Sequence, residues 1–164
     1  MLIDSNLELA DNTALPSTGT LTDNLVIGGS KELRANIADN ATADLSGGEP
    51  IYLVIEVTAI PAGSLATYNF TVFSHSSAVS AGDAAAGTLL FQTGLTAKTS
   101  LPAGKRFIVA LPEAEYAKHI MVAGAANATG GGVITSGNIN AFFTKDVVNW
   151  TGSATRVPAT DPAN

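Results

Sequence analysis

Short apolar and alternating segments, separated by Gly, Pro and Asn, run along most of this chain and predict β-strands. The clearest covers residues 51–58, which are apolar on both faces as far as Ile55 and alternate afterwards. A strand of this kind lies between two layers, or between a core and a partner. Residues 67–75 alternate cleanly between apolar and polar side chains. Further strands are expected at 25–27, 88–93, 106–111, 119–124, 133–135 and 137–143.

The segments between these strands are predicted to be turns and loops. Gly28 and Gly29 should stop the first strand, and Gly137 indicates a bulge in the last one. The other connections are a turn at 60–63, a polar stretch at 29–49 with single helical turns considered at 31–34 and 43–45, a mobile loop at 76–86 and a short turn at 113–118. Seven or eight strands without a long helix predict an all-β antiparallel sandwich, either immunoglobulin-like or jelly-roll.

The N-terminal segment is expected to form an extended arm. Its first dozen residues alternate between apolar and polar, whereas residues 13–20 suit neither a helix nor a central strand. Such an arm must lie on its own sheet or on a neighbouring subunit, which points toward assembly. We therefore divide the chain into an arm at 1–24, a sandwich domain at 25–150 and a tail at 151–164. This interpretation predicts that deleting residues 1–15 leaves a folded domain but weakens association.

Composition favours an interaction protein. The chain has 164 residues, enough for one domain with a core, yet only 13% of them are charged. Ordinary soluble domains carry about 25% charged residues, and a surface poor in charge promotes association. A plain soluble β domain is the alternative.

Charge and hydropathy exclude several classes of partner. The net charge is −6 and the eight basic residues are scattered, which disfavours direct binding to nucleic acid. No segment approaches the roughly 18 apolar residues of a membrane span, and no signal peptide is recognisable. Without cysteine there is neither a disulfide nor a thiolate metal site.

No catalytic or metal-binding pattern is recognisable. His75 and His119 each lack a ligand partner at metal spacing, and the acidic residues are isolated. No Ser stands in a nucleophile context. We therefore expect a protein that is not an enzyme and needs neither a metal nor a cofactor.

Several apolar residues cannot all point into one core and are candidates for contacts with a partner. Phe73 faces away from Phe70 and Val72, and Phe142 stands beside Phe143. Trp150 either anchors the tail against a partner or caps the end of the core. Together with the arm, the candidate capsid or subunit contacts are Leu2, Ile3, Leu7, Leu9, Tyr52, Phe73, Phe142 and Trp150, with Val54 beside Tyr52.

An ordered series of motifs over residues 1–145 resembles the cement, or decoration, proteins on the heads of tailed bacteriophages. The motifs are Ile3-Asp4-Ser5-Asn6-Leu7-Glu8-Leu9-Ala10-Asp11, Gly48-Glu49-Pro50-Ile51-Tyr52-Leu53-Val54, Leu101-Pro102-Ala103-Gly104-Lys105-Arg106, Leu111-Pro112 with Tyr116, and Thr135-Ser136-Gly137-Asn138-Ile139-Asn140-Ala141.

The resemblance implies a jelly-roll-like sandwich that forms a homodimer or homotrimer. It also implies a place on the outer surface of the capsid, after synthesis in the host cytoplasm, where the protein bridges major capsid subunits. The long connection at 29–47 and the tail at 151–164 depart from the family pattern. The alternative function is a carbohydrate-binding or adhesin-like sandwich, which requires exposed aromatic side chains. A hydrolase, the third alternative, requires a cluster of titratable groups.

Overall fold

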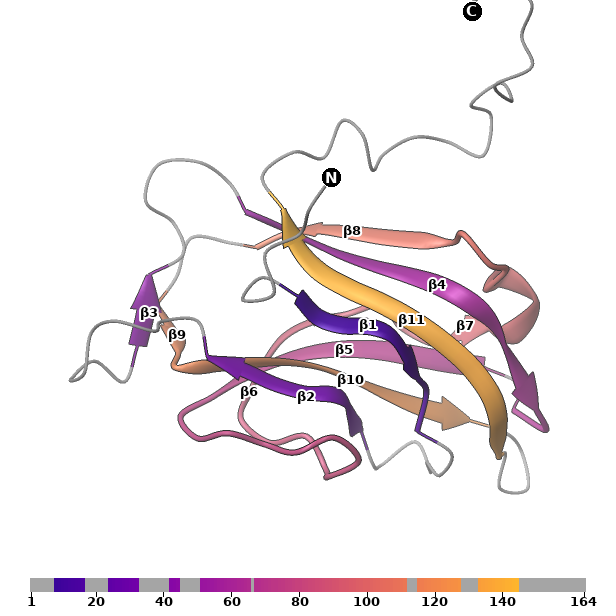
Figure 1. Cartoon of the computed structure of the whole chain (residues 1–164), viewed down its shortest axis with the longest axis horizontal. Coiled ribbons are helices and arrows are strands. Elements are labelled where there is room, and N and C mark those ends of the chain that lie inside the picture. The colour runs from indigo at the N-terminus through magenta and orange to yellow at the C-terminus, as the bar shows by residue number, and fades with distance from the viewer. Residues whose placement is uncertain are drawn as a thin grey trace, which may run out of the picture.

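A computed structural model of the chain describes residues 8–16, 24–32, 42–44, 51–65, 67–111, 115–127 and 133–144. This part of the chain forms strands and one short 3-10 turn (Figure 1). The elements are β1 (Glu8–Ala14), β2 (Leu25–Glu32), β3 (Thr42–Asp44), β4 (Tyr52–Gly63), β5 (Thr67–His75), β6 (Thr88–Gln92), β7 (Thr96–Ala97), η1 (Lys98–Ser100), β8 (Arg106–Ala110), β9 (Glu115–Ala117), β10 (His119–Asn127) and β11 (Ile134–Thr144).

The strands form two antiparallel sheets that pack face to face, which confirms the predicted sandwich. The first sheet has the order β1-β11-β4-β8, and the second has the order β2-β10-β5-β6, with β7 also paired to β5. Strands β3 and β9 form a separate two-stranded ladder. Figure 1 shows the two sheets as layers, with this small ladder at one end.

The pairing of the strands is that of a jelly-roll. Setting aside β3, β7 and β9 leaves eight strands, in which the first pairs with the last, the second with the second last, and so on inward. The four ladders are β1 with β11, β2 with β10, β4 with β8, and β5 with β6. A long hairpin of such pairs, rolled so that neighbouring ladders alternate between two sheets, is a jelly-roll.

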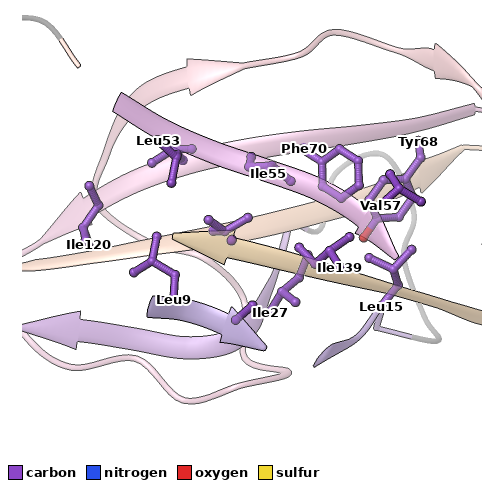
Figure 2. Packing of buried hydrophobic residues seen from close by; sticks show 14 of the residues in the cluster. Leu9, Leu15, Ile27, Leu53, Ile55, Val57, Tyr68, Phe70, Ile120 and Ile139 are labelled. Atoms are coloured by element: carbon purple, nitrogen blue, oxygen red, sulfur yellow. The ribbon is translucent and has the colours of Figure 1, made fainter. Parts of the chain in front are cut away.

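Alternating side chains of both sheets fill the space between them (Figure 2). Leu53, Ile55 and Val57 of β4 meet Phe70 and other inward side chains of the second sheet, and all of them are fully buried. The alternation predicted for residues 67–75 is confirmed. Because successive side chains of a strand point to opposite faces, every second residue of each sheet points into the core between the sheets.

Residues 8–16 belong to the sandwich, so the domain boundary predicted at residue 25 is wrong. Strand β1 pairs with β11, and Leu9 and Leu15 are only 2% and 5% exposed within the core. The N-terminal segment was expected to lie either on its own sheet or on a neighbouring subunit, and residues 8–14 of it lie on their own sheet. Strand β1 also lies close to β2. A Cβ added at Gly28 of β2 would sit only 2.6 Å from the Leu9 carbonyl oxygen of β1.

Two strands continue through positions that were predicted to end them. Strand β2 runs through Gly28 and Gly29, whose positive φ angles of 74° and 89° make an irregular stretch opposite β10. Strand β4 continues through Pro61 to Gly63, and the pairing with β11 changes register on both sides of Gly137. The irregularity expected at Gly137 is thus confirmed. Pro61 is tolerated because it lies opposite this irregular part of β11, and a proline without a backbone N–H is accepted at such positions.

The segment 76–87, which includes the loop predicted at 76–86, is hydrogen-bonded to the sandwich. It follows the free edge of β2, where Val26 N donates to the Asp83 carbonyl at 2.9 Å and Gly82 N donates to the Val26 carbonyl at 2.8 Å. Farther along this edge, Ser30 N donates to the Val79 carbonyl at 2.9 Å. These bonds satisfy backbone groups that an edge strand would leave open.

The short β3–β9 ladder replaces two other expected features. Residues 43–45 were considered as a helical turn, but Thr42–Asp44 is a strand. Residues 113–118 were expected to be a turn, but Glu115–Ala117 is its partner strand. Both predictions are wrong because pairing between distant segments overrides weak local preferences.

Candidate interaction surface

Among the described residues, no three His, Asp or Glu side chains are grouped so that they could hold a metal ion. Within the same ranges, no helix is long and apolar enough to cross a membrane. The surface features of the sandwich are therefore the place to look for function.

One end of the sandwich collects the exposed apolar side chains. Strands β1, β4, β6 and β10 run toward this end, and β2, β5, β8 and β11 start from it. We call its described residues, 59–65, 93–105 and 133–137, the loop end; it lies on the right in Figure 1. Ile60, Leu95 and Val133 are 56%, 55% and 49% exposed here. Only one further large apolar side chain in the described ranges, Leu89 of β6 at 47%, is exposed to this degree.

Hydrogen bonds hold the segments of the loop end together. Ser64 N donates to the Val133 carbonyl at 3.0 Å, and Val133 N donates to Ser64 Oγ at 3.1 Å. Lys98 Nζ donates to the Gly63 carbonyl at 2.8 Å and so links η1 to the end of β4. Beneath them, Leu65 and Leu101 are buried in the core. The exposed apolar side chains therefore stand on a rigid base, which reduces the entropy lost on binding.

The charge of the loop end differs from that of the whole chain. Residues 59–65, 93–105 and 133–137 contain Lys98 and Lys105 but neither Asp nor Glu, although the net charge of the chain is −6. Glu32 and Lys118, an ion pair at 2.9 Å, lie at the opposite end, whereas the pair of Arg106 and Glu56, also at 2.9 Å, lies where β8 leaves the loop end. The surface is thus apolar and weakly basic, and it suits a partner surface that is apolar or mildly acidic.

A polar network covers part of the outer face of the first sheet beside the loop end. Asn12 has a φ of 41°, and its backbone N donates to Asn140 Oδ1 at 2.7 Å. Its side-chain Oδ1 accepts a bond from Thr58 Oγ1 at 2.9 Å, and its carbonyl accepts one from Asn138 Nδ2 at 2.7 Å. Asparagine tolerates this left-handed backbone better than other non-glycine residues. The network fixes β1 onto β11 and β4 near the loop end.

Three of the predicted contact residues lie together but do not form a free surface. Tyr52, Val54 and Phe142 are neighbours on the outer face of the first sheet, where Val54 pairs with Phe142 and with Ile108. However, Val54 and Phe142 are 0% and 2% exposed, and only Tyr52 is partly exposed. The prediction that Phe142 does not point into the core between the sheets holds, but its role as an exposed contact is contradicted by its burial.

The other predicted contacts are dispersed. Phe73 is partly buried on the outer face of the second sheet, next to Met121, and so lies on the other side of the molecule. Leu9 is buried in the core and is not available to a partner. The remaining candidates lie outside the described residues: Leu2, Ile3, Leu7, Trp150 and the tail at 151–164.

The exposed residues of the loop end were missed, because Ile60 was assigned to a turn, Val133 was expected in a strand and Leu95 was given no role. Ile60 precedes Pro61, Leu95 follows Gly94, and Val133 follows a run of glycines. A large aliphatic side chain inside a Gly- or Pro-rich connection is the signal that marks them, since such connections lie on the surface.

The chain is thus a jelly-roll sandwich that exposes Ile60, Leu95 and Val133 at its loop end. No protein-family model matches the chain, and no curated protein matches it either.

Proposed function

We propose that this chain is a non-enzymatic decoration protein that binds the outside of a tailed-bacteriophage head and bridges major capsid subunits. The observation that carries the proposal is the loop end, where Ile60, Leu95 and Val133 expose about half of their surface in segments that contain neither Asp nor Glu. The jelly-roll pairing and the ordered sequence motifs support the same function.

The energy available from the loop end suits multivalent attachment. Full burial of a large aliphatic side chain is worth about 1.5–3 kcal/mol, so each half-exposed side chain contributes about 1 kcal/mol. Three such side chains contribute about 3 kcal/mol, a factor of roughly 150 in affinity. A homodimer or homotrimer repeats this contact on the symmetric shell, and linked contacts raise the overall affinity without any new interaction.

Binding to heads that lack the protein tests this function. The purified chain is mixed with such heads, and the bound fraction is measured by co-sedimentation over a range of concentrations. We expect saturable binding, and electron microscopy should show added density at fixed positions on the shell. A chain that does not bind heads, or that instead binds a defined glycan, contradicts the proposal.

Matched variants test whether the loop end makes the contact. Leu95→Asp should weaken binding by about tenfold, and combining it with Val133→Asp should weaken it further, because a buried carboxylate is costly without a partner. Leu89→Asp is the control, since Leu89 is similarly exposed but lies on β6 opposite Phe73. Equal loss of binding in the control and in the loop-end variants contradicts the assignment of this surface.

A further inference from the structure

The fold brings the two histidines of the chain together. The sequence contains only His75 and His119, which lie on different strands. They are direct partners in the register of β5 with β10, although sequence reasoning treated each of them as isolated. Side chains of directly opposed residues lie on the same face, with Cβ atoms about 4.5–5.5 Å apart.

We propose that His75 and His119 form a two-histidine site for a divalent transition-metal ion such as Zn²⁺. This proposal is independent of the proposed function. Imidazole nitrogen is a preferred ligand of such ions, whereas Mg²⁺ and Ca²⁺ prefer oxygen. Because no three potential ligands are grouped in the described residues, the two imidazoles would share the ion with water.

The hydrogen bonds of His75 suit a metal ligand. Its Nδ1 lies 3.0 Å from the Ser77 carbonyl oxygen, to which it donates when it carries the ring proton, and 3.1 Å from Ser77 N, from which it accepts when it does not. A metal-binding histidine commonly donates its other ring N–H to a backbone carbonyl, which fixes the ring and leaves the second nitrogen free for the ion. When Nδ1 donates to the Ser77 carbonyl, Nε2 keeps the lone pair that an ion needs, so metal binding would select this tautomer over the one in which Nδ1 accepts from Ser77 N.

The second imidazole lacks a partner that the site would supply. His119 Nδ1 is buried and has no hydrogen-bond partner among the residues that the structure describes. A buried polar nitrogen without a partner costs free energy, and an ion between the two rings would offset this cost. On its other side, His119 is in register with Glu32, whose carboxylate is paired with Lys118 at 2.9 Å. The carboxylate therefore adds negative potential near the site while it remains bound to the lysine.

Metal titration of the full chain, freed of any affinity tag and of bound metal, tests the site. Isothermal titration with Zn²⁺ should give one ion per chain, and Mg²⁺ should give no binding. His75→Ala and His119→Ala should each weaken Zn²⁺ binding by about tenfold or more, which corresponds to roughly 1.4 kcal/mol. Asp11→Asn, which removes an exposed carboxylate of β1 in the other sheet, should leave the affinity unchanged.

A spectroscopic measurement on the unaltered protein avoids any effect of a substitution on folding. Because the chain has two histidines, its imidazole NMR spectrum contains two spin systems, and Zn²⁺ should shift both at the same stoichiometry. A wild-type chain without Zn²⁺ uptake, histidine variants that bind as tightly as wild type, or a shift of one imidazole alone would overturn the proposal.

Discussion

A substitution at Gly124 tests the closest contact inside the core. Gly124 of β10 lies against the ring of Tyr68, and a Cβ at this position would sit 2.0 Å from the phenolic oxygen and 2.5 Å from Cζ. The ring has little room to move, because Tyr68 is 1% exposed and packs edge-on against Phe70 with centroids 4.8 Å apart. We therefore expect Gly124→Ala to destabilise the fold by about 1–3 kcal/mol, the usual cost of overpacking.

The sign of the effect makes this prediction decisive. Gly124 is not among the glycines with positive φ, so alanine fits its backbone. Without the contact to Tyr68, alanine in a strand would stabilise the protein by roughly 0.5–1 kcal/mol relative to glycine. Thermal unfolding measures the difference, because 1 kcal/mol shifts Tm by about 2–4 °C in a chain of this size. A variant as stable as wild type, or more stable, refutes the assigned packing.

A double-mutant cycle locates the origin of the loss. In a Tyr68→Leu background the ring atoms that meet the new methyl group are absent, so Gly124→Ala should cost much less there than in wild type. A coupling energy above about 0.5 kcal/mol is expected for residues in direct contact. Additive effects would show that the destabilisation arises elsewhere in β10.

The remaining predictions concern the core and the edge of β2. Tyr68→Phe should raise stability by up to about 1 kcal/mol in thermal unfolding, because it removes a buried hydroxyl without a hydrogen-bond partner in the described part of the chain. Burial raises the pKa of Tyr68 above its ordinary value of 10.0, so above pH 10 the unfolded chain loses a proton that the folded chain keeps. Stability should then fall with rising pH by at most about 1.4 kcal/mol per unit, and the fall should be smaller in Tyr68→Phe. Leu9→Ala should cost about 2–5 kcal/mol in denaturant unfolding, since Leu9 is a core residue, and deletion of residues 1–15 should destabilise the domain rather than leave it intact. Ser30→Ala should speed amide hydrogen exchange at Val79, whose N–H donates to Ser30 Oγ at 2.8 Å; unchanged exchange would contradict a role for this bond in holding the segment.

The parts of the fold that the sequence predicted are those with strong local patterns. Residues 67–75 alternate so regularly that both their extent and their inward face are confirmed by β5. No long segment has apolar residues at the helical spacing of about 3.6 residues, and this likewise favoured an all-β sandwich. The choice of jelly-roll over an immunoglobulin-like sandwich came from the resemblance, because the order of strands depends on pairing between distant segments that periodicity does not report.

The sequence failed where long-range contacts decide the local structure. Gly28 and Pro61 are breakers by local chemistry, yet strands continue through both because neighbouring strands accommodate the irregularities. Residues 76–87 look like a free loop, but the open edge of β2 binds them. The two histidines are 44 positions apart, and only the register of β5 with β10 makes them neighbours.

The two ends of the sandwich differ in a way that bears on how the molecule would sit on a shell. The loop end is apolar and free of acids, whereas Glu32, Lys118 and both histidines lie toward the opposite end. If the loop end faces the capsid, charged and hydrated groups face outward, where they need not be desolvated. The reverse orientation would bury the ion pair of Glu32 and Lys118, and exposed pairs gain too little to repay such desolvation. The distribution of charge thus favours one orientation, so that a metal ion between His75 and His119 would lie on the side facing away from the shell.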